Sequence, residues 1–489
     1  MHKRKSKLRE RTELVFIYTA MIAAIAIILS SLVLVVQGYR FNQYDGKIEQ
    51  GGLVQFGSLP TGANVVVDNV QLSSKTNSKI TLSSGDHEIT YSRLGYSDWK
   101  KSVTVEPGTI LWLTYARMFP TQPVTAIIDG GEPVTSEAIS PNQTWLAYIR
   151  NPSVPDISLV NISDTTPQVT HVAIPEASYT VASDATSQRF KLLSWDKDSQ
   201  TVLVEHDYND TSEYLVLSMR GSNTAYNVST ELGLKIKKIE FSSGDSNVLY
   251  AQTSANDLRR INISSSTISG PLVTNISDFT ASGQVVITYV TLANKDGIRQ
   301  VGYVSGGSSV AKVIASYVLG DDVPIHAAIG DYFNERYIAL SHGMAVDVST
   351  TGSLPSSDSI SILNLKPVTQ MLLGDNADYL GFSPSDKRMV YAQYGGNRVS
   401  TYDLELGLSS IVTMPSSLTR EIDWLDDFHI SATIDGSVSY YDYDGTNGQM
   451  VATGVTNLPL VVEGNNKYMY YFTTSDTGNS LTRVSLLPQ

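Results

Sequence analysis

The chain has 489 residues, of which 42 % are hydrophobic and 17 % are charged, and its formal net charge is −13. This length accommodates roughly two to four domains, and the apolar content excludes an intrinsically disordered chain. The absence of cysteine excludes disulfides, thiolate metal ligands and a thiol nucleophile. Because nucleic-acid surfaces need clustered lysine and arginine, the acidic balance leads us to expect no nucleic-acid partner.

An uncharged segment near the N-terminus predicts a membrane span. Residues Leu14 to Val36 carry no charged side chain, and a helix of that length crosses a hydrocarbon core of ~30 Å. The segment is longer than a secretory core of ~7–15 residues, and no small-residue cleavage site follows it. We therefore interpret it as an uncleaved signal anchor that contacts the lipid bilayer, the alternative being a buried core helix.

The charges before this segment predict its orientation. Basic side chains outnumber the acidic Glu10 and Glu13; they are Lys3, Arg4, Lys5, Lys7, Arg9 and Arg11. Under the positive-inside rule, residues 1–13 form a cytoplasmic tail. The expected location is the plasma membrane in a single pass, with the C-terminal body extracytoplasmic. Residues 37–56 form a juxtamembrane segment, in which Tyr39, Phe41 and Tyr44 suit the outer membrane interface.

Beyond the span the pattern is that of β-structure, with short Val-, Ile-, Tyr- and Thr-rich runs separated by Gly, Asn, Asp and Ser. The first block, residues 57–117, predicts a small antiparallel β-sandwich. Its expected strands are Ala63 to Asn69, Lys79 to Leu82, His87 to Ser92, Trp99 to Val105 and Ile110 to Tyr115. Its expected core residues are Val65, Val67, Leu82, Ile89, Trp99 and Val103.

This block resembles the PEGA domain family, which is named for a Pro-Glu-Gly-Ala motif at its first strand. Here the motif is Pro60-Thr61-Gly62-Ala63, followed by turns at Ser84-Gly85-Asp86-His87 and Leu94-Gly95-Tyr96. Trp99, Val103 and Val105 match the closing strand, while Thr61 and Ser84 depart from the family pattern. The resemblance implies a non-catalytic module of exported proteins and no catalytic residues.

A connector at 118–123, which contains Pro120 and Pro123, precedes a repeating region at 124–489. Each unit has an apolar residue, a polar turn and an apolar strand, as at Ile139 to Ile149 and Gly381 to Ala392. About eight units of roughly 46 residues match known propeller repeats of ~40–50 residues. Further copies lie near Leu193, Glu240, Phe279, Ile329, Ile422 and Val461.

The Phe-Ser-Pro-Ser-Asp and Ile-Ser-Pro-Asn versions resemble repeats of TolB-like and WD-like propellers. The region therefore predicts a seven- or eight-bladed β-propeller, the alternative being a chain of separate β-sandwiches. We expect Val124 to Asp129 to pair with the last strand, Leu481 to Leu487, and so to close the ring without free edges. The fold class is mainly β after one transmembrane helix.

A search for catalytic motifs identifies no nucleophile elbow and no His-x-x-x-His metal pair. The histidines are His2, His87, His171, His206, His326, His342 and His429. Ser341-His342-Gly343 offers a nucleophile only if distant residues complete a triad, and a strand or turn role is favoured.

Aspartates offer two further candidates. Residues Asp442 to Gly448 place alternate aspartates before a glycine, as calcium loops do, but Thr453 stands where an EF-hand has glutamate, which favours an Asp-Gly turn. Paired carboxylates for glycoside chemistry occur in predicted turns at Asp196 with Asp198 and at Asp426 with Asp427. We assign no catalytic, cofactor-binding or metal residues.

Two surface signals leave alternatives open. Tyrosines at 440, 441, 443, 468, 470 and 471 can face a sugar or peptide, or serve as strand residues. Asn-x-Ser/Thr sequons begin at Asn142, Asn161, Asn209, Asn227, Asn262 and Asn275. Because the PEGA resemblance favours a prokaryotic source, we interpret these sequons as surface composition.

The sequence as a whole predicts a non-enzymatic, membrane-anchored binding or scaffolding protein of a bacterial cell envelope. Its partners are the bilayer, through Leu14 to Val36, and an envelope protein or cell-wall glycan that contacts a propeller face. No cofactor is expected. The alternatives are an envelope carbohydrate-active hydrolase or lyase that uses carboxylates at the propeller channel, and a receptor that signals through a cytoplasmic partner.

Overall fold

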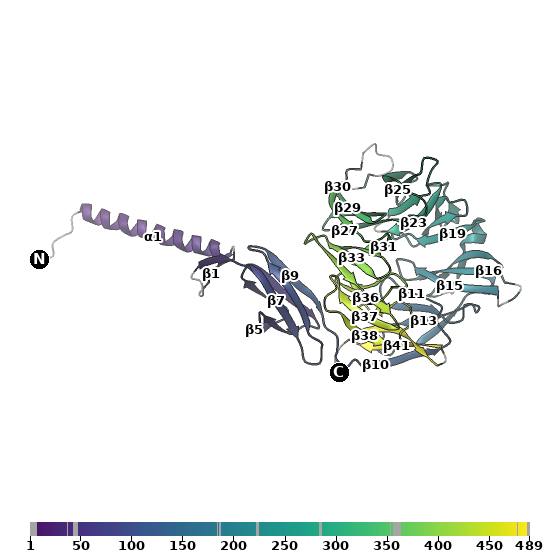
Figure 1. The fold of residues 1–489 in the computed structure, drawn as a ribbon, viewed down its shortest axis with the longest axis horizontal. Coiled ribbons are helices and arrows are strands. Elements are labelled where there is room, and N and C mark those ends of the chain that lie inside the picture. Colours follow the sequence, from purple (N-terminus) through teal and green to yellow (C-terminus); the bar gives the residue numbers. More distant parts are fainter. Residues whose placement is uncertain are drawn as a thin grey trace. The chain divides into compact units, whose positions relative to one another are not determined.

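The computed structural model describes residues 7–36, 38–42, 47–182, 184, 187–221, 224–282, 286–352, 354–355, 363–476 and 478–486. The chain divides into two compact units, Met1–Gln122 and Pro123–Leu487, whose elements are labelled in Figure 1. Of the residues singled out in the sequence, those outside the described residues are His2, Lys3, Arg4, Lys5, Tyr44 and Leu487.

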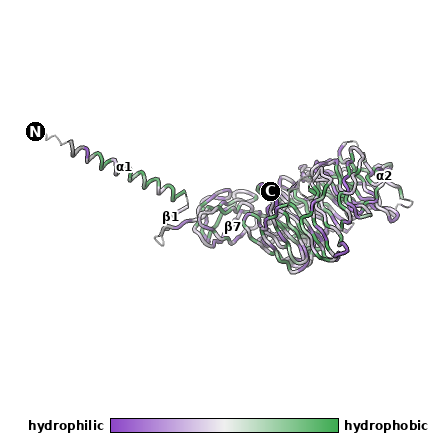
Figure 2. The backbone as a smooth tube through the Cα atoms, turned by 90° about the horizontal axis from the view of Figure 1, so that it is seen from above, coloured by the Kyte–Doolittle hydropathy of each residue, from purple (hydrophilic) through white to green (hydrophobic). Residues whose placement is uncertain are grey.

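One long helix, α1 (Lys7–Val36), contains the predicted span. Within the described residues it is the one helix long and apolar enough to cross a membrane, over Leu14–Val36. Every side chain from Leu14 to Val36 is exposed, and Figure 2 shows the hydrophobic colouring of the helix. An apolar surface of this extent is unfavourable in water and suits lipid. The helix begins before Leu14 because Lys, Arg and Glu are good helix formers.

A short hairpin of β1 (Tyr39–Asn42) and β2 (Lys47–Gln50) follows α1. Two sheets then form a sandwich, with strand orders β6-β3-β9 and β5-β4-β7-β8. The strands are β3 (Gly52–Leu59), β4 (Asn64–Val67), β5 (Val70–Lys75), β6 (Ser78–Leu82), β7 (Gly85–Ser92), β8 (Trp99–Val105) and β9 (Ile110–Arg117).

The sandwich differs from the expectation in two respects. It includes β3, so that its first strand begins at Gly52, before residue 57, because the side chains of Val54 and Phe56 are buried in its core. The expectation of a wholly antiparallel sandwich was wrong, because β3 and β9 pair in parallel. A parallel pair needs a long crossover connection, and here the other sheet supplies it.

The expected sandwich core is confirmed. Five of the six predicted residues are buried, and Val103 is partly buried against them. Aromatic rings join the two sheets: Tyr91 stacks on Trp99 with ring centroids 4.9 Å apart and meets Phe56 edge-on at 6.1 Å. The hydroxyl of Tyr91 donates to the carbonyl of Leu113 at 2.9 Å, so its polar end is satisfied inside the core.

The second unit contains, among the described residues, eight four-stranded sheets, as expected for an eight-bladed propeller. The first four sheets in chain order are β11 (Ser136–Ile139), β12 (Trp145–Ile149), β13 (Asp156–Asn161), β14 (Val169–Ala173); β15 (Gln188–Trp195), β16 (Thr201–Tyr208), β17 (Thr211–Ser218), β18 (Ala225–Asn227); β19 (Ile236–Phe241), β20 (Val248–Thr253), β21 (Leu258–Asn262), β22 (Thr267–Ile268); and β23 (Ile276–Ser282), β24 (Val286–Thr291), β25 (Ile298–Ser305), β26 (Ala311–Val318).

The next three sheets are β27 (Ile325–Tyr332), β28 (Glu335–His342), β29 (Ala345–Thr351), β30 (Lys366–Leu372); β31 (Ala377–Phe382), β32 (Met389–Tyr394), β33 (Arg398–Asp403), β34 (Leu408–Thr413); and β35 (Asp423–Asp426), β36 (His429–Ile434), β37 (Ser437–Asp442), β38 (Gln449–Thr453). The closing sheet joins the two ends of the unit and comprises β39 (Val461–Val462), β40 (Tyr468–Ser475), β41 (Gly478–Ser485) and β10 (Thr125–Gly131). Two short helices, η1 (Glu176–Ser178) and α2 (Val228–Leu232), lie in connections.

The predicted repeat corresponds to the first two strands of each sheet, and the first strands of neighbouring sheets contact one another in the series β11, β15, β19, β23, β27 and β31. The turns between those two strands also bond from sheet to sheet. The carboxylate of Asp427 accepts the backbone N–H groups of Ser385 at 3.0 Å and Asp386 at 2.9 Å. The hydroxyl of Ser246 donates to Asp198 at 2.6 Å. These polar turns therefore connect neighbouring sheets as well as reversing the chain.

The expected pairing of the two ends is confirmed, because β10 pairs antiparallel with β41; Leu487 lies outside the described residues. The expectation that this pairing leaves no free edge was wrong, because β10 is itself the outermost strand of its sheet. The carboxylate of Asp129, on β10, accepts hydrogen bonds from Tyr148 at 2.5 Å and from Arg150 at 2.6 Å. Tyr148 lies on β12 of the next sheet, and Arg150 comes directly after that strand. Arg150 also donates to the carbonyl of Asn479, on β41, at 2.9 Å. One carboxylate and one guanidinium thus hold three strands together.

Asp129→Asn should lower the free energy of unfolding by about 1.5–3 kcal/mol at pH 7, since hydrogen bonds to a charged group are lost. Burial opposes ionisation of Asp129, but the bonds from Tyr148 and Arg150 outweigh it and lower the pKa. The stabilisation is therefore present above the unfolded-state pKa and is lost as pH falls through the folded-state pKa.

Denaturant titrations of the full chain in detergent from pH 7 to pH 2 measure this effect. The difference between wild type and D129N should shrink toward zero at the acidic end. Asp164→Asn, at an exposed aspartate of a turn, is the control and should leave stability unchanged. A D129N deficit that is independent of pH would contradict the account.

Candidate ligand-binding site in the propeller

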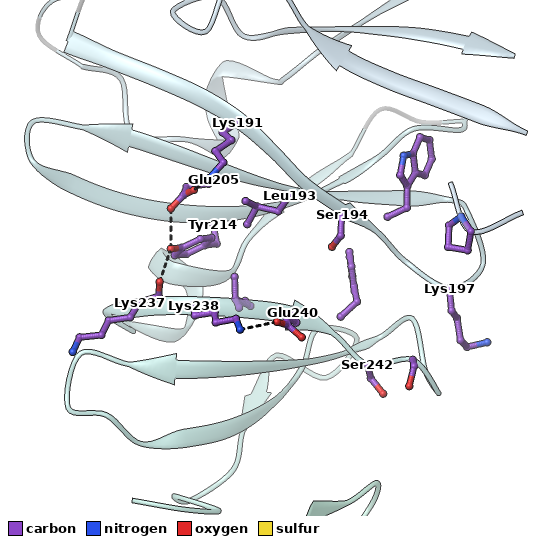
Figure 3. Close-up of a pocket in the computed structure, with 15 residues that line it drawn as sticks. Lys191, Leu193, Ser194, Lys197, Glu205, Tyr214, Lys237, Lys238, Glu240 and Ser242 are labelled. Atoms are coloured by element: carbon purple, nitrogen blue, oxygen red, sulfur yellow. Dashed lines mark hydrogen bonds and ion pairs between the residues drawn. The ribbon is translucent and has the colours of Figure 1, made fainter. Parts of the chain in front are cut away.

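A cavity of about 730 Å³ lies between the first strands of two neighbouring sheets, β15 and β19. Figure 3 shows the side chains around it, with Lys191 and Glu205 toward one end and Lys197 and Ser242 toward the other. Its size falls within the ~300–1,000 Å³ of ligand sites. Its apolar lining comprises Pro141, Leu193, Trp195, Ile239 and Phe241.

Four lysines line this cavity, against two glutamates, although the whole chain has an acidic balance. Lys191 lies 3.5 Å from the carboxylate of Glu205 and keeps 61 % of its side chain exposed. Lys197 pairs with the exposed Asp198 at 2.9 Å, and Lys237 donates to the side chain of Asn256 at 2.7 Å. The two ion pairs lie at the surface, where such pairs are worth only ~0–1 kcal/mol, and Lys237 has no carboxylate in this contact, so an incoming anion can compete for these ammonium groups.

The fourth lysine, Lys238, is held by the neighbouring sheet. Its ammonium lies 3.1 Å from Glu240 and 2.8 Å from Asp278, and donates to the carbonyl of Phe279 at 2.6 Å. Burial alone would lower the pKa of Lys238, but these two carboxylates outweigh it and raise the pKa. Glu240 also accepts the N–H of Ala281 at 2.7 Å. This wall therefore carries one ammonium and two carboxylates, and the positive charge that an anion can reach belongs to the other three lysines of the lining.

A hydroxyl and a carboxylate form the polar end of the cavity. Tyr214 donates to Glu205 at 3.1 Å and lies 3.3 Å from the carbonyl of Lys237. Burial, with the negative charge of Glu205, raises the pKa of Tyr214, so its hydroxyl stays protonated. Glu205 is therefore oriented between Lys191 and Tyr214, and it can exchange either partner for a ligand group.

Three carboxyl groups, separate from the lysine-lined cavity, lie on or just before the first strands β11 and β35: Glu137, Glu421 and Asp423. The carboxylate of Asp423, on β35, accepts hydrogen bonds from Arg420, one at 3.2 Å, and from the N–H of Leu460 at 3.3 Å. Glu421 accepts the hydroxyl of Tyr391 at 2.5 Å. Both oxygens of Glu137, on β11, are shielded from solvent and have no hydrogen-bond partner among the described residues.

The environment of these carboxyls opposes their ionisation. Burial raises the pKa of Glu137 well above its usual value, the negative charge of Asp423 adds to this, and Arg420 opposes it. Burial also raises the pKa values of Glu421 and Asp423. A carboxyl that retains its proton is the form that a general acid requires. The shielding of the Glu137 oxygens, however, leaves no open path from them to a ligand in this conformation.

The histidines do not assemble a site. Five of them lie within hydrogen-bonding distance of a carboxylate: His87 of Asp68, His171 of Asp156, His206 of Glu213, His342 of Asp347 and His429 of Asp426. The other ring nitrogen of His429 lies 3.5 Å from Asp442, so this histidine stands between two of the aspartate candidates. His326 contacts the carbonyl of Ala377 at 3.1 Å. His2 lies outside the described residues, within which no group of three His, Asp or Glu side chains is arranged to hold a metal.

The Ser341-His342 pair is divided between the two faces of β28. Ser341 is fully buried, and its hydroxyl accepts the N–H of His326 at 2.9 Å. His342 stacks on Tyr317 with ring centroids 4.5 Å apart and pairs with Asp347 at 2.7 Å. Adjacent strand residues point to opposite faces, so this histidine cannot activate that serine.

The aspartate candidates serve turns. Asp196 is buried and accepts the N–H groups of Gln200 at 2.7 Å and Thr201 at 2.9 Å. At the calcium-like segment, the carbonyl of Asp442 accepts the N–H of Gly445 at 2.8 Å, and its carboxylate accepts the side-chain amide of Asn447 at 2.9 Å. These contacts are those of an Asp-Gly turn. The paired-carboxylate candidates likewise bond to turns of their own or the neighbouring sheet.

The tyrosine runs belong mainly to the core. Tyr440, Tyr443, Tyr470 and Tyr471 are buried, and the hydroxyl of Tyr470 donates to the carbonyl of Ile162 at 2.8 Å. One sequon is also structural, because the buried Asn227 caps α2 by accepting the N–H of Thr230 at 3.1 Å.

Comparisons with known proteins identify one domain. Residues 52–118 match the model of the PEGA domain, which agrees with the resemblance at Pro60 to Ala63 and with the sandwich that begins at β3. No curated protein matches the chain.

Solved structures with similar folds cover the larger part of the chain. Sqt1 of Saccharomyces cerevisiae is 12 % identical with a TM-score of 0.45, over 75 % of this chain and 98 % of that one. The Cps50 (Swd1) β-propeller domain of Myceliophteria thermophila is 11 % identical with a TM-score of 0.40, over 75 % and 100 %. An oligogalacturonate lyase from Vibrio parahaemolyticus is 11 % identical with a TM-score of 0.37, over 60 % and 88 %.

Glu137→Gln tests whether burial of Glu137 raises its pKa and so makes the stability of the protein depend on pH. The pKa of Glu137 in the folded protein is raised above its unfolded value, so its favourable contribution is complete below the unfolded-state pKa and is lost as pH rises through the folded-state pKa. A glutamine of the same shape does not titrate. The melting temperature of E137Q should therefore exceed that of wild type by a margin that grows from pH 4 to pH 8.

Thermal unfolding of the full chain in detergent, followed by near-ultraviolet circular dichroism, measures this margin. Glu132→Gln, at an exposed glutamate in the connection before β11, should follow the wild-type curve throughout. Parallel curves for wild type and E137Q would show that burial does not affect Glu137 ionisation.

Proposed function

We propose that this protein is a single-pass, membrane-anchored binding protein of the cell envelope, whose extracytoplasmic propeller holds a negatively charged ligand between β15 and β19. The observation that carries the proposal is the cavity with four lysines in a chain of net charge −13. The anchor is α1, and the PEGA domain is the module that follows it. The function is binding, without a chemical step.

The cavity favours a ligand that carries carboxylate or phosphate groups beside an apolar part. Lysine ammonium groups attract such anions, and a surrounding acidic surface would repel them everywhere else. Leu193, Ile239 and Phe241 offer apolar contact along the same wall. The amino groups of Lys191 and Lys197 lie in the exposed part of the lining, where a long chain can pass across the cavity. Anionic wall polymers and acidic segments of envelope proteins share this chemistry.

The combined Lys191→Glu and Lys197→Glu substitutions should reduce binding at least tenfold, because they reverse two positive charges without altering buried groups. The full chain in detergent is incubated with isolated cell-wall sacculi and, separately, with detergent-solubilised envelope proteins. The retained fraction is then quantified. The arm that retains the protein identifies the source of the anionic groups.

Two controls accompany this test. Lys191→Arg with Lys197→Arg keeps the charge and should preserve retention, and Lys295→Glu reverses an exposed charge outside the cavity and should have no effect. Equal retention of wild type and the double glutamate variant would contradict the proposed site.

The anchor is tested by charges in its centre. Arginine in place of both Ile25 and Ile28, which are exposed on α1, should abolish membrane insertion, since each charge costs ~2.5–3.5 kcal/mol at a span centre. Wild type should sediment with carbonate-washed membranes and the arginine variant should not, whereas leucine at both positions should behave as wild type. Recovery of wild type in the soluble fraction would refute the anchor.

The second candidate function is a carbohydrate-active hydrolase or lyase, and the raised pKa values of Glu137, Glu421 and Asp423 favour it. Its test is turnover of soluble wall glycan fragments, followed by mass spectrometry. Cleavage by wild type that E421Q and D423N abolish, while E132Q preserves it, would replace the binding proposal by this one. Absence of cleavage by wild type would leave binding as the function.

A further inference from the structure

One face of the PEGA domain exposes apolar side chains beside the end of α1. On the outer face of the β6-β3-β9 sheet, Ile110 is 50 % exposed and Trp112 is 44 % exposed. The register places Ile110 beside Leu53, and Trp112 beside Gln55. Lys79, on β6, lies on the other side of Gln55. We refer to these five residues as the β9 face.

The charge of this sheet differs from that of the chain as a whole. None of the residues of β3, β6 and β9 is Asp or Glu, whereas acidic residues outnumber basic ones in the chain, 48 to 35. The β9 face combines an indole, two aliphatic side chains, an amide and one ammonium group. Tryptophan and lysine are the side chains that proteins place at the boundary between lipid tails and headgroups, since each has an apolar part and a polar end.

Hydrogen bonds connect this sheet to the last turn of α1. The N–H of Gly38 donates to the carbonyl of Val35 at 3.0 Å, and the N–H of Gly51 donates to the carbonyl of Gly38 at 3.0 Å. The N–H of Gly108, just before β9, donates in turn to the carbonyl of Gly51 at 2.9 Å. Three successive bonds therefore lead from the helix end to the start of β9, although many residues separate them in the sequence.

Close backbone contacts tighten this junction. A Cβ atom on Gly51 would lie 2.1 Å from the carbonyl oxygen of Leu82, and one on Gly52 would lie 2.6 Å from that of Glu106. No side chain fits at either position, so glycine permits the strands to meet. If α1 ends at the membrane surface, the first residues of β9 are held within a few residues of that surface.

We propose that the β9 face is a membrane-contact surface: Ile110 and Trp112 enter the headgroup region of the bilayer that α1 crosses, and Lys79 meets lipid phosphates. This inference rests on the proposed anchor. The occupant is the lipid surface because the face is continuous, through Gly51 and Gly38, with the membrane-spanning helix, and because its charge suits anionic headgroups. A second copy of the chain is the competing occupant.

The absence of cysteine makes this proposal directly testable, since one introduced cysteine gives one label. Single cysteines replace Ile110, Trp112, Gln55 on the same face, or Leu94, and each carries a bimane fluorophore. Leu94 is 98 % exposed and lies beside Gly95, whose carbonyl accepts the N–H of Thr121 beyond the far end of β9. It is therefore the matched exposed apolar control. Ala24→Cys reports on the anchor itself.

The full chain is reconstituted in vesicles of phosphatidylcholine and phosphatidylglycerol, with and without lipids that carry a quenching nitroxide near the headgroup or deep in the tail. Labels at 110, 112 and 55 should lose about half of their emission to headgroup nitroxides, as residues at the lipid interface do. The label at 24 should be quenched by deep nitroxides, and the label at 94 by neither. Gln55→Cys preserves the test if either apolar substitution impairs folding.

Quenching at 24 without quenching at 110, 112 and 55 would overturn the membrane-contact surface while the anchor stands. Absence of quenching at 24 would overturn the anchor, and the surface with it. A loss of emission at 112 that depends on protein density, without any nitroxide lipid, would identify contact with a second copy and would also overturn the proposal.

Discussion

The organisation of this protein depends on the pairing of strand edges. A strand at the edge of a sheet presents unpaired N–H and C=O groups, and without β10 the closing sheet would have three strands with β41 at its edge. Here β10, from the beginning of the second unit, adds to β41, from its end. The last sheet is therefore completed by a strand from the beginning of the unit, and this pairing ties the two ends of the ring together.

Contacts between neighbouring sheets also hold the charged side chains of the first strands. Lys238 pairs with Asp278 of the next sheet, and Asp423 accepts the N–H of Leu460, just before the closing sheet begins at β39. Between β15 and β19, four lysines line a cavity. On or beside β11 and β35 lie carboxyls, such as Glu137, whose pKa is raised by burial. Charged groups of both places thus take part in the contacts that hold neighbouring sheets together.

The sequence was sufficient where the signal is local. An uncharged run, a Pro-Thr-Gly-Ala motif and a repeated apolar-turn-apolar unit each predict their structure from neighbouring residues, and α1, the PEGA domain and the sheets follow. It was insufficient where the determinant is a distant contact. Pairing of β3 with β9 joins residues far apart in the chain. Gln55 and Gly57 interrupt the apolar run within β3, so the sequence pattern does not indicate a strand there. The sandwich therefore begins earlier than expected.

The candidate cavity was missed for the same reason. Lys191, Leu193 and Trp195 alternate along β15, and Lys238 and Glu240 alternate along β19, but neither pattern indicates that the two strands flank one cavity. That arrangement depends on the angle between neighbouring sheets. The alternation of charged and apolar residues in the first strand of each repeat was the available signal, because these strands face the centre of a propeller. The aspartate turns were interpreted correctly, since an Asx turn is set by residues two to five positions away.

Hydrogen exchange of the full chain in detergent micelles, followed by mass spectrometry, tests ring closure most directly. The account predicts that peptides covering β10 exchange as slowly as those covering β40 and β41, because the N-terminal strand opens only when the whole ring opens. Rapid exchange in β10 while β40, β41 and the other sheets stay protected would show that the strand is a dispensable edge, and would contradict the account.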